Sequence, residues 1–311
     1  MTKIAFIYPG QGSQAVGMGG PFLYDERSRG FFEQADKALG FNLSELMLEG
    51  PAEKLTLTYH AQPALLTVSS MITERLAREG IVPSYTAGHS LGEYSALVAS
   101  GVLKFEKAVE LVHKRGLFMN DAVPAGEGTM AAILGMESAA LEKITNEVTD
   151  STGVVQLANL NSPGQIVISG TKAGVEEACR LAKENGAKRA IPLDVSGPFH
   201  SELMRPASMD LSEVLSKAFL MDARVPVVSN VTAQPETNAA QLQDLLVRQL
   251  YSPVLWEQSV RKMIELGVTV FVEIGPGKVL SGLVKKIDRS LTVLPVHDME
   301  SCEKAIEELK R

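Results

Sequence analysis

The pentapeptide Gly88-His89-Ser90-Leu91-Gly92 is the segment of the chain best suited to chemistry. It has the spacing Gly-x-Ser-x-Gly and lies between a strand-like run, residues 85–87, and a helix-like run, residues 93–100. This context predicts a nucleophile elbow, a sharp strand-to-helix turn that lifts the serine to its tip. The glycines let the backbone pass closely, and the free N–H groups of the following helix suit an oxyanion. The alternative is a tight turn that merely contains a serine.

A serine nucleophile needs a base, and His200 is the best placed of the five histidines. It follows Ser196-Gly197-Pro198-Phe199 and begins a predicted helix. His89 adjoins Ser90 at a sharp turn, so the two side chains should diverge, and His113 is expected on a solvated helix face. We therefore expect His200 to activate Ser90. The alternative is a histidine that makes a local hydrogen bond near a helix start.

The acid of a Ser-His-Asp triad is missing from its expected place. An α/β-hydrolase carries this acid on a separate loop between nucleophile and histidine. Asp194 lies only six residues before His200, which is too close for that role. Either the triad is absent, or another group such as a backbone carbonyl orients the histidine.

Arg115 lies in the middle of an apolar helical stripe. The predicted helix covers residues 105–122, and the neighbours of Arg115 one turn away on either side are apolar: Leu111, Val112, Phe118 and Met119. Burying an unpaired guanidinium is costly. Either the side chain extends its charged end to water, or it forms a fixed fork for a substrate carboxylate.

Two glycine-rich turns follow predicted strands. Pro9-Gly10-Gln11-Gly12-Ser13-Gln14 lies where open α/β sheets place their ligands. It lacks the phosphate-loop spacing, and we expect it to supply an N–H donor opposite the elbow. Gly275-Pro276-Gly277-Lys278 also lacks that spacing, so we expect a simple strand-to-helix turn there.

Composition narrows the class of protein. The chain has 311 residues and a formal net charge of −7, which argues against broad nucleic-acid binding. Two cysteines, Cys179 and Cys302, form no CxxC pair and fit a reducing compartment. We expect Cys179 to be a buried structural thiol. No signal-peptide pattern and no run long enough to cross a membrane is present, so we expect a cytoplasmic protein.

Strand and helix patterns alternate along the chain, which predicts an α/β fold with a mostly parallel sheet. The expected strands are residues 4–8, 84–87, 225–231, 268–274 and 291–296. The expected helices between them are residues 31–39, 62–78, 105–122, 240–250 and 256–266.

Residues 126–195 have a different order of elements. The pattern is strand 129–134, helix 137–148, strands 154–159 and 165–169, helix 172–185 and strand 190–195. This β-α-β-β-α-β order is the ferredoxin-like unit. We expect a large α/β-hydrolase-like domain from residues 1–125 and 196–311, with the ferredoxin-like small domain inserted between them. The active site is expected in the cleft between the two.

Taken together, these motifs resemble the malonyl-CoA:acyl carrier protein transacylases of fatty-acid and polyketide synthesis. The resemblance covers essentially the whole chain, without departure at a catalytic position, and is closest in kind to the free-standing bacterial enzymes. The motifs that carry it are residues 9–14, Gln62-Pro63-Ala64, residues 88–93, Arg115, Asn161-Ser162-Pro163-Gly164-Gln165, Gly197-Pro198-Phe199-His200-Ser201 and residues 275–280.

The resemblance implies a ping-pong acyl transfer through a malonyl ester of Ser90, with His200 as the base. It implies that the backbone carbonyl of Gln249 orients His200, and that the N–H groups of Gln11 and Leu91 form the oxyanion hole. No metal or other cofactor is implied, and malonyl-CoA is a substrate. The implied substrate-binding residues are Arg115, which takes the malonyl carboxylate, with Phe199, Gln62, His89 and Asn161.

The resemblance also implies acyl carrier protein as partner, and carrier proteins of this pathway are acidic. Because the chain is itself acidic, docking requires a local basic patch. We expect this patch, unless its members are ordinary solvated charges, to comprise Lys188, Arg189, Lys285, Lys286 and Arg289. Neither a nucleic acid nor a membrane is expected as partner, and we expect a monomer.

Two rival functions remain open from sequence. One is a serine thioesterase that transfers the acyl group to water; a hydrolase of neutral acyl chains has no use for a buried Arg115. The other is a non-catalytic scaffold that binds carrier protein, against which the Ser90 and His200 pair argues. The sequence does not distinguish fatty-acid from polyketide synthesis.

Overall fold

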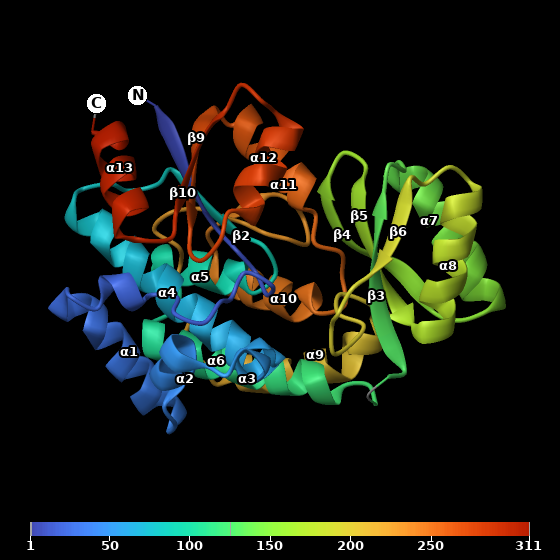
Figure 1. Cartoon of the computed structure of the whole chain (residues 1–311), viewed down its shortest axis with the longest axis horizontal. Coiled ribbons are helices and arrows are strands. Elements are labelled where there is room, and N and C mark those ends of the chain that lie inside the picture. Colours follow the sequence, from blue (N-terminus) through green and yellow to red (C-terminus); the bar gives the residue numbers. More distant parts are fainter. Residues whose placement is uncertain (1, 125, 311) are drawn as a thin grey trace.

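The computed structural model describes residues 2–124 and 126–310 and contains two separate β-sheets (Figure 1). The larger sheet has six strands, of which neighbours pair in parallel except for the last pair. Their spatial order is β10 (Thr292–Val296), β9 (Val268–Ile274), β1 (Lys3–Tyr8), β2 (Tyr85–Gly88), β7 (Val227–Val228) and β8 (Pro235–Glu236). The predicted α/β class with a mostly parallel sheet is confirmed.

Helices cover both faces of this sheet (Figure 1). Phe6 and Tyr8 of β1 point into one apolar core and Ala5 and Ile7 into another, so the strand is buried on both sides. This is the usual environment of a parallel strand and explains its continuous apolar sequence. The helices are α1 (Glu26–Leu39), α2 (Leu43–Glu49), α3 (Ala52–Thr56), α4 (Thr58–Arg78), α5 (Gly92–Ala99), α6 (Phe105–Asp121), α9 (Arg205–Ser216), α10 (Ala239–Gln249), α11 (Trp256–Glu265), α12 (Val279–Ile287) and α13 (Met299–Leu309), with 3₁₀ turns Gly20–Phe22 and Glu202–Met204.

The second sheet is antiparallel and belongs to the predicted insertion. Its elements are β3 (Gly128–Leu134), α7 (Ser138–Ser151), β4 (Val155–Ser162), β5 (Gln165–Thr171), α8 (Lys172–Glu184) and β6 (Arg189–Pro192). The strand order β4-β5-β3-β6 is that of a ferredoxin-like unit, and α7 and α8 cover the face turned away from the larger sheet (Figure 1). The predicted β-α-β-β-α-β order is thus confirmed.

This segment has its own apolar core, which includes Ile133, Leu141 and Ile168. We therefore propose that residues 126–195 form a small domain by themselves. The expected boundary at residue 125 lies outside the described residues. One parallel bridge, between Asn159 of β4 and Val254, joins the small sheet to the loop after α10.

Several element boundaries differ from the prediction. Helix α1 begins at Glu26 rather than at residue 31, because the carboxylate of Asp25 accepts the N–H of Ser28 and caps the helix. Strand β7 ends at Val228 rather than at residue 231, because the backbone N–H of Asn230 donates to the Glu93 carboxylate and the Ser229 carbonyl accepts the Ala233 N–H in a turn. Sequence patterns also missed the helices α2, α3 and α13.

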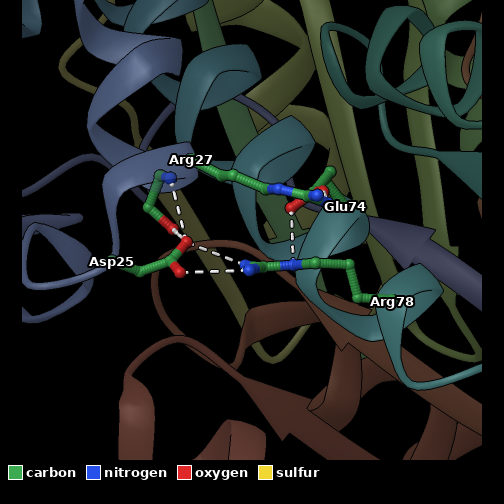
Figure 2. Close-up of polar contacts among 5 residues, drawn as sticks. Asp25, Arg27, Glu74 and Arg78 are labelled. Carbon is green, nitrogen blue, oxygen red and sulfur yellow. Dashed lines mark hydrogen bonds and ion pairs between the residues drawn. The ribbon is translucent and has the colours of Figure 1, made fainter.

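A polar cluster joins α1 to α4 at the molecular surface (Figure 2). The guanidinium of Arg78 makes a two-pronged pair with Asp25, at 3.0 and 2.8 Å, and its Nε contacts Glu74 at 3.0 Å. Arg27 contacts the same Glu74 at 3.3 Å. The pKa of the Asp25 carboxyl is held far below its usual range, mainly by the hydrogen bond from Arg78 and also by the hydrogen bonds from Ser28. This cluster supports the scaffold and lies outside the site described below.

Within the described ranges, no helix combines the length and the apolar character needed to cross a membrane.

Candidate active site

Ser90 occupies the turn between β2 and α5, as the elbow motif predicted. Its φ of 51° lies in the left-handed region, which a residue with a side chain rarely adopts. A Cβ on Gly88 would lie 1.9 Å from the carbonyl carbon of Gly92, and one on Gly92 would lie 2.1 Å from the Tyr8 oxygen. Both glycines are therefore required by close backbone contacts, and the turn leaves the serine facing a cavity.

His200 lies directly against this serine. Its Nε2 is 2.8 Å from Ser90 Oγ, and its Nδ1 is 2.8 Å from the backbone oxygen of Gln249. Because a carbonyl only accepts, Nδ1 carries the proton and Nε2 is free to accept the serine proton. Burial, followed by the charge of Arg115, lowers the pKa of His200 to about 3, so the imidazole is neutral at physiological pH.

The orienting group is thus a carbonyl rather than an acid. Asp194 lines the same cavity, but among the described residues neither it nor another carboxylate bonds to His200. The missing triad acid noted in the sequence is replaced by the Gln249 carbonyl.

Arg115 of α6 is enclosed, with only 1% of its surface exposed. Its Nη1 donates to Gln62 Oε1 at 2.8 Å, and its Nη2 donates to Gln249 Oε1 at 2.9 Å and to Ser90 Oγ at 3.2 Å. The alternative in which its charged end reaches water is therefore wrong. Desolvation lowers the pKa of Arg115, and no carboxylate among the described residues forms an ion pair with it.

The cavity in front of these residues has a volume of about 200 Å³. Ser90, His200 and Arg115 form its polar end, and Phe199 with Met119 belongs to its apolar wall. This small space suits a short acyl group.

Two backbone N–H groups at the cavity, those of Gln11 and Leu91, are suited to an oxyanion, because the other N–H groups of the elbow are already engaged. The N–H of Ser90 donates to Asn230 Oδ1 at 2.8 Å, and that of Gly92 donates to the His89 oxygen at 2.9 Å. In the part of the chain that the structure describes, the N–H groups of Gln11 and Leu91 donate to no protein acceptor. Both residues line the cavity.

His89 points away from the nucleophile, as expected. Its Nε2 lies 2.8 Å from Asn161 Oδ1 of the small sheet, and its ring faces Trp256. His89 and Asn161 line a second cavity of about 300 Å³ between the first glycine-rich turn, α12 and the small sheet. Because the two cavities share residues such as Gln11 and Leu193, they adjoin and suit an extended thioester arm.

The second glycine-rich turn is structural. The carboxylate of Glu273 accepts the N–H groups of Leu280 at 3.0 Å and Ser281 at 2.7 Å. It therefore already occupies the N-terminus of α12, where a phosphate would otherwise bind. The prediction of a strand-to-helix turn agrees with this arrangement.

Two sequence expectations outside the site were wrong. His113 is not on a solvated face, because its Nδ1 is 2.7 Å from the Tyr59 oxygen and its ring faces Phe41. Cys179 is only partly buried rather than buried, although burial still raises the pKa of its thiol. Among the described residues, no group of side chains forms a metal-ligand cluster.

The expected basic patch is exposed, but its members are not equally free. Lys285 Nζ donates to the carbonyl oxygens of Leu291 and Arg289, whereas Lys286 Nζ donates to Gln165 Oε1 at the start of β5. Gln165 pairs with Leu134, and Leu134 pairs with Arg189. Gln165, which Lys286 contacts, and Arg189 thus lie at the same edge of the small sheet, with their backbones about two strand spacings, or roughly 10 Å, apart. Lys188 precedes that edge, packed against Gly135.

Sequence reasoning missed Glu93 and Asn230, which are buried behind the elbow. The signal for Glu93 was an acidic residue on an otherwise apolar short helix. Asn230 carried no signal of its own.

Comparison with known proteins identifies the family. The family model described as acyl transferase domain matches residues 5–309. The malonyl CoA-acyl carrier protein transacylase of Bacillus subtilis is 60% identical, covering 100% of this chain and 98% of its own. The chain belongs to this family of transacylases. The protein of the same name from Escherichia coli K12 is 46% identical, covering 99% of this chain and 100% of its own.

Solved structures agree on the fold. The malonyl CoA-acyl carrier protein transacylase from Coxiella burnetii has a TM-score of 0.97 at 42% identity and covers 100% of this chain and 98% of its own. A chain in the structure of a type II polyketide acyl-carrier protein in complex with its malonyl-transacylase gives a TM-score of 0.96 at 42% identity. The match covers 99% of this chain and 100% of that chain. The resemblance stated from the motifs, and with it the assignment to an enzyme family, is therefore confirmed.

Proposed function

We propose that this transacylase moves a malonyl group from malonyl-CoA to the phosphopantetheine thiol of acyl carrier protein, through a malonyl ester of Ser90. The observation that carries the proposal is the placement of Arg115 Nη2 only 3.2 Å from the Ser90 Oγ that contacts His200. A serine nucleophile beside a fixed cation suits an acyl group that itself ends in a carboxylate. The setting is fatty-acid or type II polyketide synthesis, in the cytoplasm.

In the first half-reaction, Ser90 Oγ attacks the thioester carbonyl while its proton passes to His200 Nε2. The tetrahedral oxyanion lies between the N–H groups of Gln11 and Leu91. The C–S bond then breaks, and the coenzyme A thiolate takes the proton from His200. Ser90 is left as its malonyl ester, and the base is neutral again.

The second half-reaction is the reverse with a different thiol. The pantetheine thiol of carrier protein gives its proton to His200, and its sulfur attacks the ester carbonyl in the same oxyanion hole. The C–O bond breaks and Ser90 recovers its proton from His200. Atoms and protons balance within the serine, the histidine and the two thiols, so we propose no cofactor.

The buried Arg115 is the reason to propose transfer of a dicarboxylic acyl group rather than the rival function, hydrolysis of neutral acyl chains. Its fork binds the malonyl carboxylate and fixes the thioester against Ser90, with Gln62 orienting the fork through their 2.8 Å hydrogen bond. Phe199 limits the width of the pocket. His89 and Asn161 border the route by which the thioester arm enters.

We further propose that acidic carrier protein docks on the edge formed by Lys286 and Arg189, with Lys188 beside them. Both sides of the interdomain cleft contribute, since Lys286 lies on α12 and Arg189 on β6. Lys285 and Arg289 add positive charge nearby, although the Lys285 ammonium is engaged by its own loop.

Intact mass spectrometry after incubation with malonyl-CoA tests the central step. We expect the mass of one malonyl group on the wild type and none on Ser90→Ala. His200→Ala should form the adduct about 10²–10⁴-fold more slowly, the usual contribution of a general base. An adduct of equal yield on Ser90→Ala would overturn the proposal.

A further inference from the structure

Two buried polar side chains behind the elbow have no part in the chemistry described above. Asn230 follows β7 and is 0% exposed, and Glu93 lies in the first turn of α5 and is 1% exposed. Buried polar groups are costly unless they are hydrogen-bonded. Their partners are therefore informative about why they are there.

Asn230 holds the backbone that leads into the nucleophile. Its Oδ1 accepts the N–H of Ser90 at 2.8 Å, and its Nδ2 donates to the oxygen of Gly88 at 2.6 Å. Directly after these two contacts, Ser90 has the strained φ of 51°. Such a conformation persists only where surrounding contacts over-determine it, and Asn230 supplies two of them.

The same contact defines the oxyanion hole. The Ser90 N–H is bound to Asn230 and the Gly92 N–H to the His89 oxygen, whereas the Leu91 N–H has no acceptor among the described residues, and Leu91 lines the cavity. The direction of that N–H depends on the peptide units that Asn230 holds.

Glu93 braces this arrangement and connects it to the base. Its Oε2 accepts the Asn230 N–H at 3.2 Å and Gln249 Nε2 at 2.7 Å. Gln249 Nε2 also donates to the backbone oxygen of Ser90 at 3.0 Å, while the backbone carbonyl of Gln249 orients His200. One buried network thus joins the backbone of the nucleophile to the segment that holds its base.

We propose that Asn230 is a positioning residue that holds Ser90 and the Leu91 N–H in their reactive geometry, with Glu93 as its brace. The inference rests on the proposed function of Ser90. It predicts that loss of Asn230 slows both half-reactions, because the same oxyanion forms in each. The affinity for malonyl-CoA is expected to stay unchanged, because Asn230 does not line the substrate cavity.

The first test compares Asn230→Ala with Ser229→Ala, a buried neighbour whose hydroxyl accepts, from the residues that the structure describes, only the Val231 N–H. Rapid-quench single turnovers measure the rate of Ser90 malonylation and its dependence on malonyl-CoA concentration. We expect Asn230→Ala to lower the maximal rate about 10- to 100-fold, the scale for a displaced reacting group, at unchanged half-saturation. Ser229→Ala should remain within about twofold of the wild type.

The second test uses Asn230→Asp, which distinguishes positioning from general support of the fold. A protonated aspartic acid can accept the Ser90 N–H with one oxygen and donate to the Gly88 oxygen with the other, whereas the ionised form cannot donate. The groups around it are Glu93 on α5, whose pKa burial raises to about 7, the charged Arg115 on α6 and the neutral His200. Burial and the Glu93 carboxylate favour the protonated aspartic acid, whereas Arg115 favours the ionised form. The malonylation rate of Asn230→Asp relative to wild type should therefore rise as the pH falls, while that of Asn230→Ala relative to wild type stays level.

Wild-type malonylation rates in Asn230→Ala would overturn the inference. So would a loss in Asn230→Ala accompanied by an equal loss of malonyl-CoA affinity, or a rate in Asn230→Asp that does not respond to pH. These outcomes leave the function of Ser90 intact, since that is tested separately by Ser90→Ala.

Discussion

Replacement of Arg115 by alanine should change which acyl group is transferred more than whether the serine reacts. The guanidinium is 1% exposed and contacts Ser90 Oγ at 3.2 Å, so a malonyl carboxylate bound to it is desolvated as well. A hydrogen bond to a charged group contributes about 1.5–3 kcal/mol. At about 1.4 kcal/mol for each factor of ten, the malonyl-to-acetyl preference should fall about 10- to 150-fold.

The ratio of the two substrates is the informative quantity. Arg115 also holds Gln62 and the side chain of Gln249, so its loss disturbs the site for every acyl group. That disturbance affects malonyl and acetyl transfer alike and cancels in the ratio. Arg115→Lys keeps a charge but not the two-pronged fork, and it should restore only part of the preference.

The assay is acylation of Ser90 by malonyl-CoA and acetyl-CoA in competition, read by intact mass on the wild type and both variants. Circular dichroism and thermal unfolding show whether each variant is folded. An unchanged malonyl-to-acetyl ratio in a folded Arg115→Ala protein would refute the carboxylate-binding role.

Two further predictions concern pocket width and docking. Phe199→Ser should raise methylmalonyl relative to malonyl turnover, but only partly, because a single methyl group changes discrimination by about 1–3 kcal/mol; no change in this ratio would place selectivity elsewhere. The double variant Lys286→Glu with Arg189→Glu should raise the KM for carrier protein, more so at low salt, and leave acylation by malonyl-CoA nearly intact. Lys104→Glu, an exposed lysine at the start of α6, is the control, and equal effects in both half-reactions would remove the docking proposal.

Much of the framework could be predicted because it depends on local pattern. The strands β1 and β9 are largely buried and mostly apolar, and the elbow is fixed by two glycines that no other residue can replace. The alternation of elements in residues 126–195 was enough to predict the small sheet. Local signals fail where a cap or a short helix decides a boundary, as at Asp25 for α1.

The interior of the site was less accessible from sequence. Whether Arg115 reaches water depends on α4 and α10, which supply its partners Gln62 and Gln249. The pattern of α6 alone left both alternatives open. Asn230 follows a strand of only two residues, and its role depends on contacts with a segment about 140 residues away in the chain.

The proximity of Arg115 and His200 leads to a final prediction about pH. His200 acts as a base only when it is neutral, and it is neutral above its pKa. In the free enzyme that pKa is about 3, because of burial and then the Arg115 charge. In the pH profile of acylation at low malonyl-CoA concentration, protonation of His200 should therefore cause no loss of rate near the ordinary histidine value of about 6.5.

Binding of the malonyl carboxylate compensates the charge of Arg115 and removes the second largest of the causes that depress the pKa of His200. The base becomes stronger when the dicarboxylic substrate is in place, which couples substrate choice to proton transfer. We expect the acid limb of the acylation rate to lie at higher pH with saturating malonyl-CoA than with subsaturating malonyl-CoA. With acetyl-CoA, which leaves Arg115 uncompensated, the two limbs should coincide. Single-turnover acylation across pH measures both, and coincident limbs for malonyl-CoA would show that Arg115 selects the substrate without tuning the base.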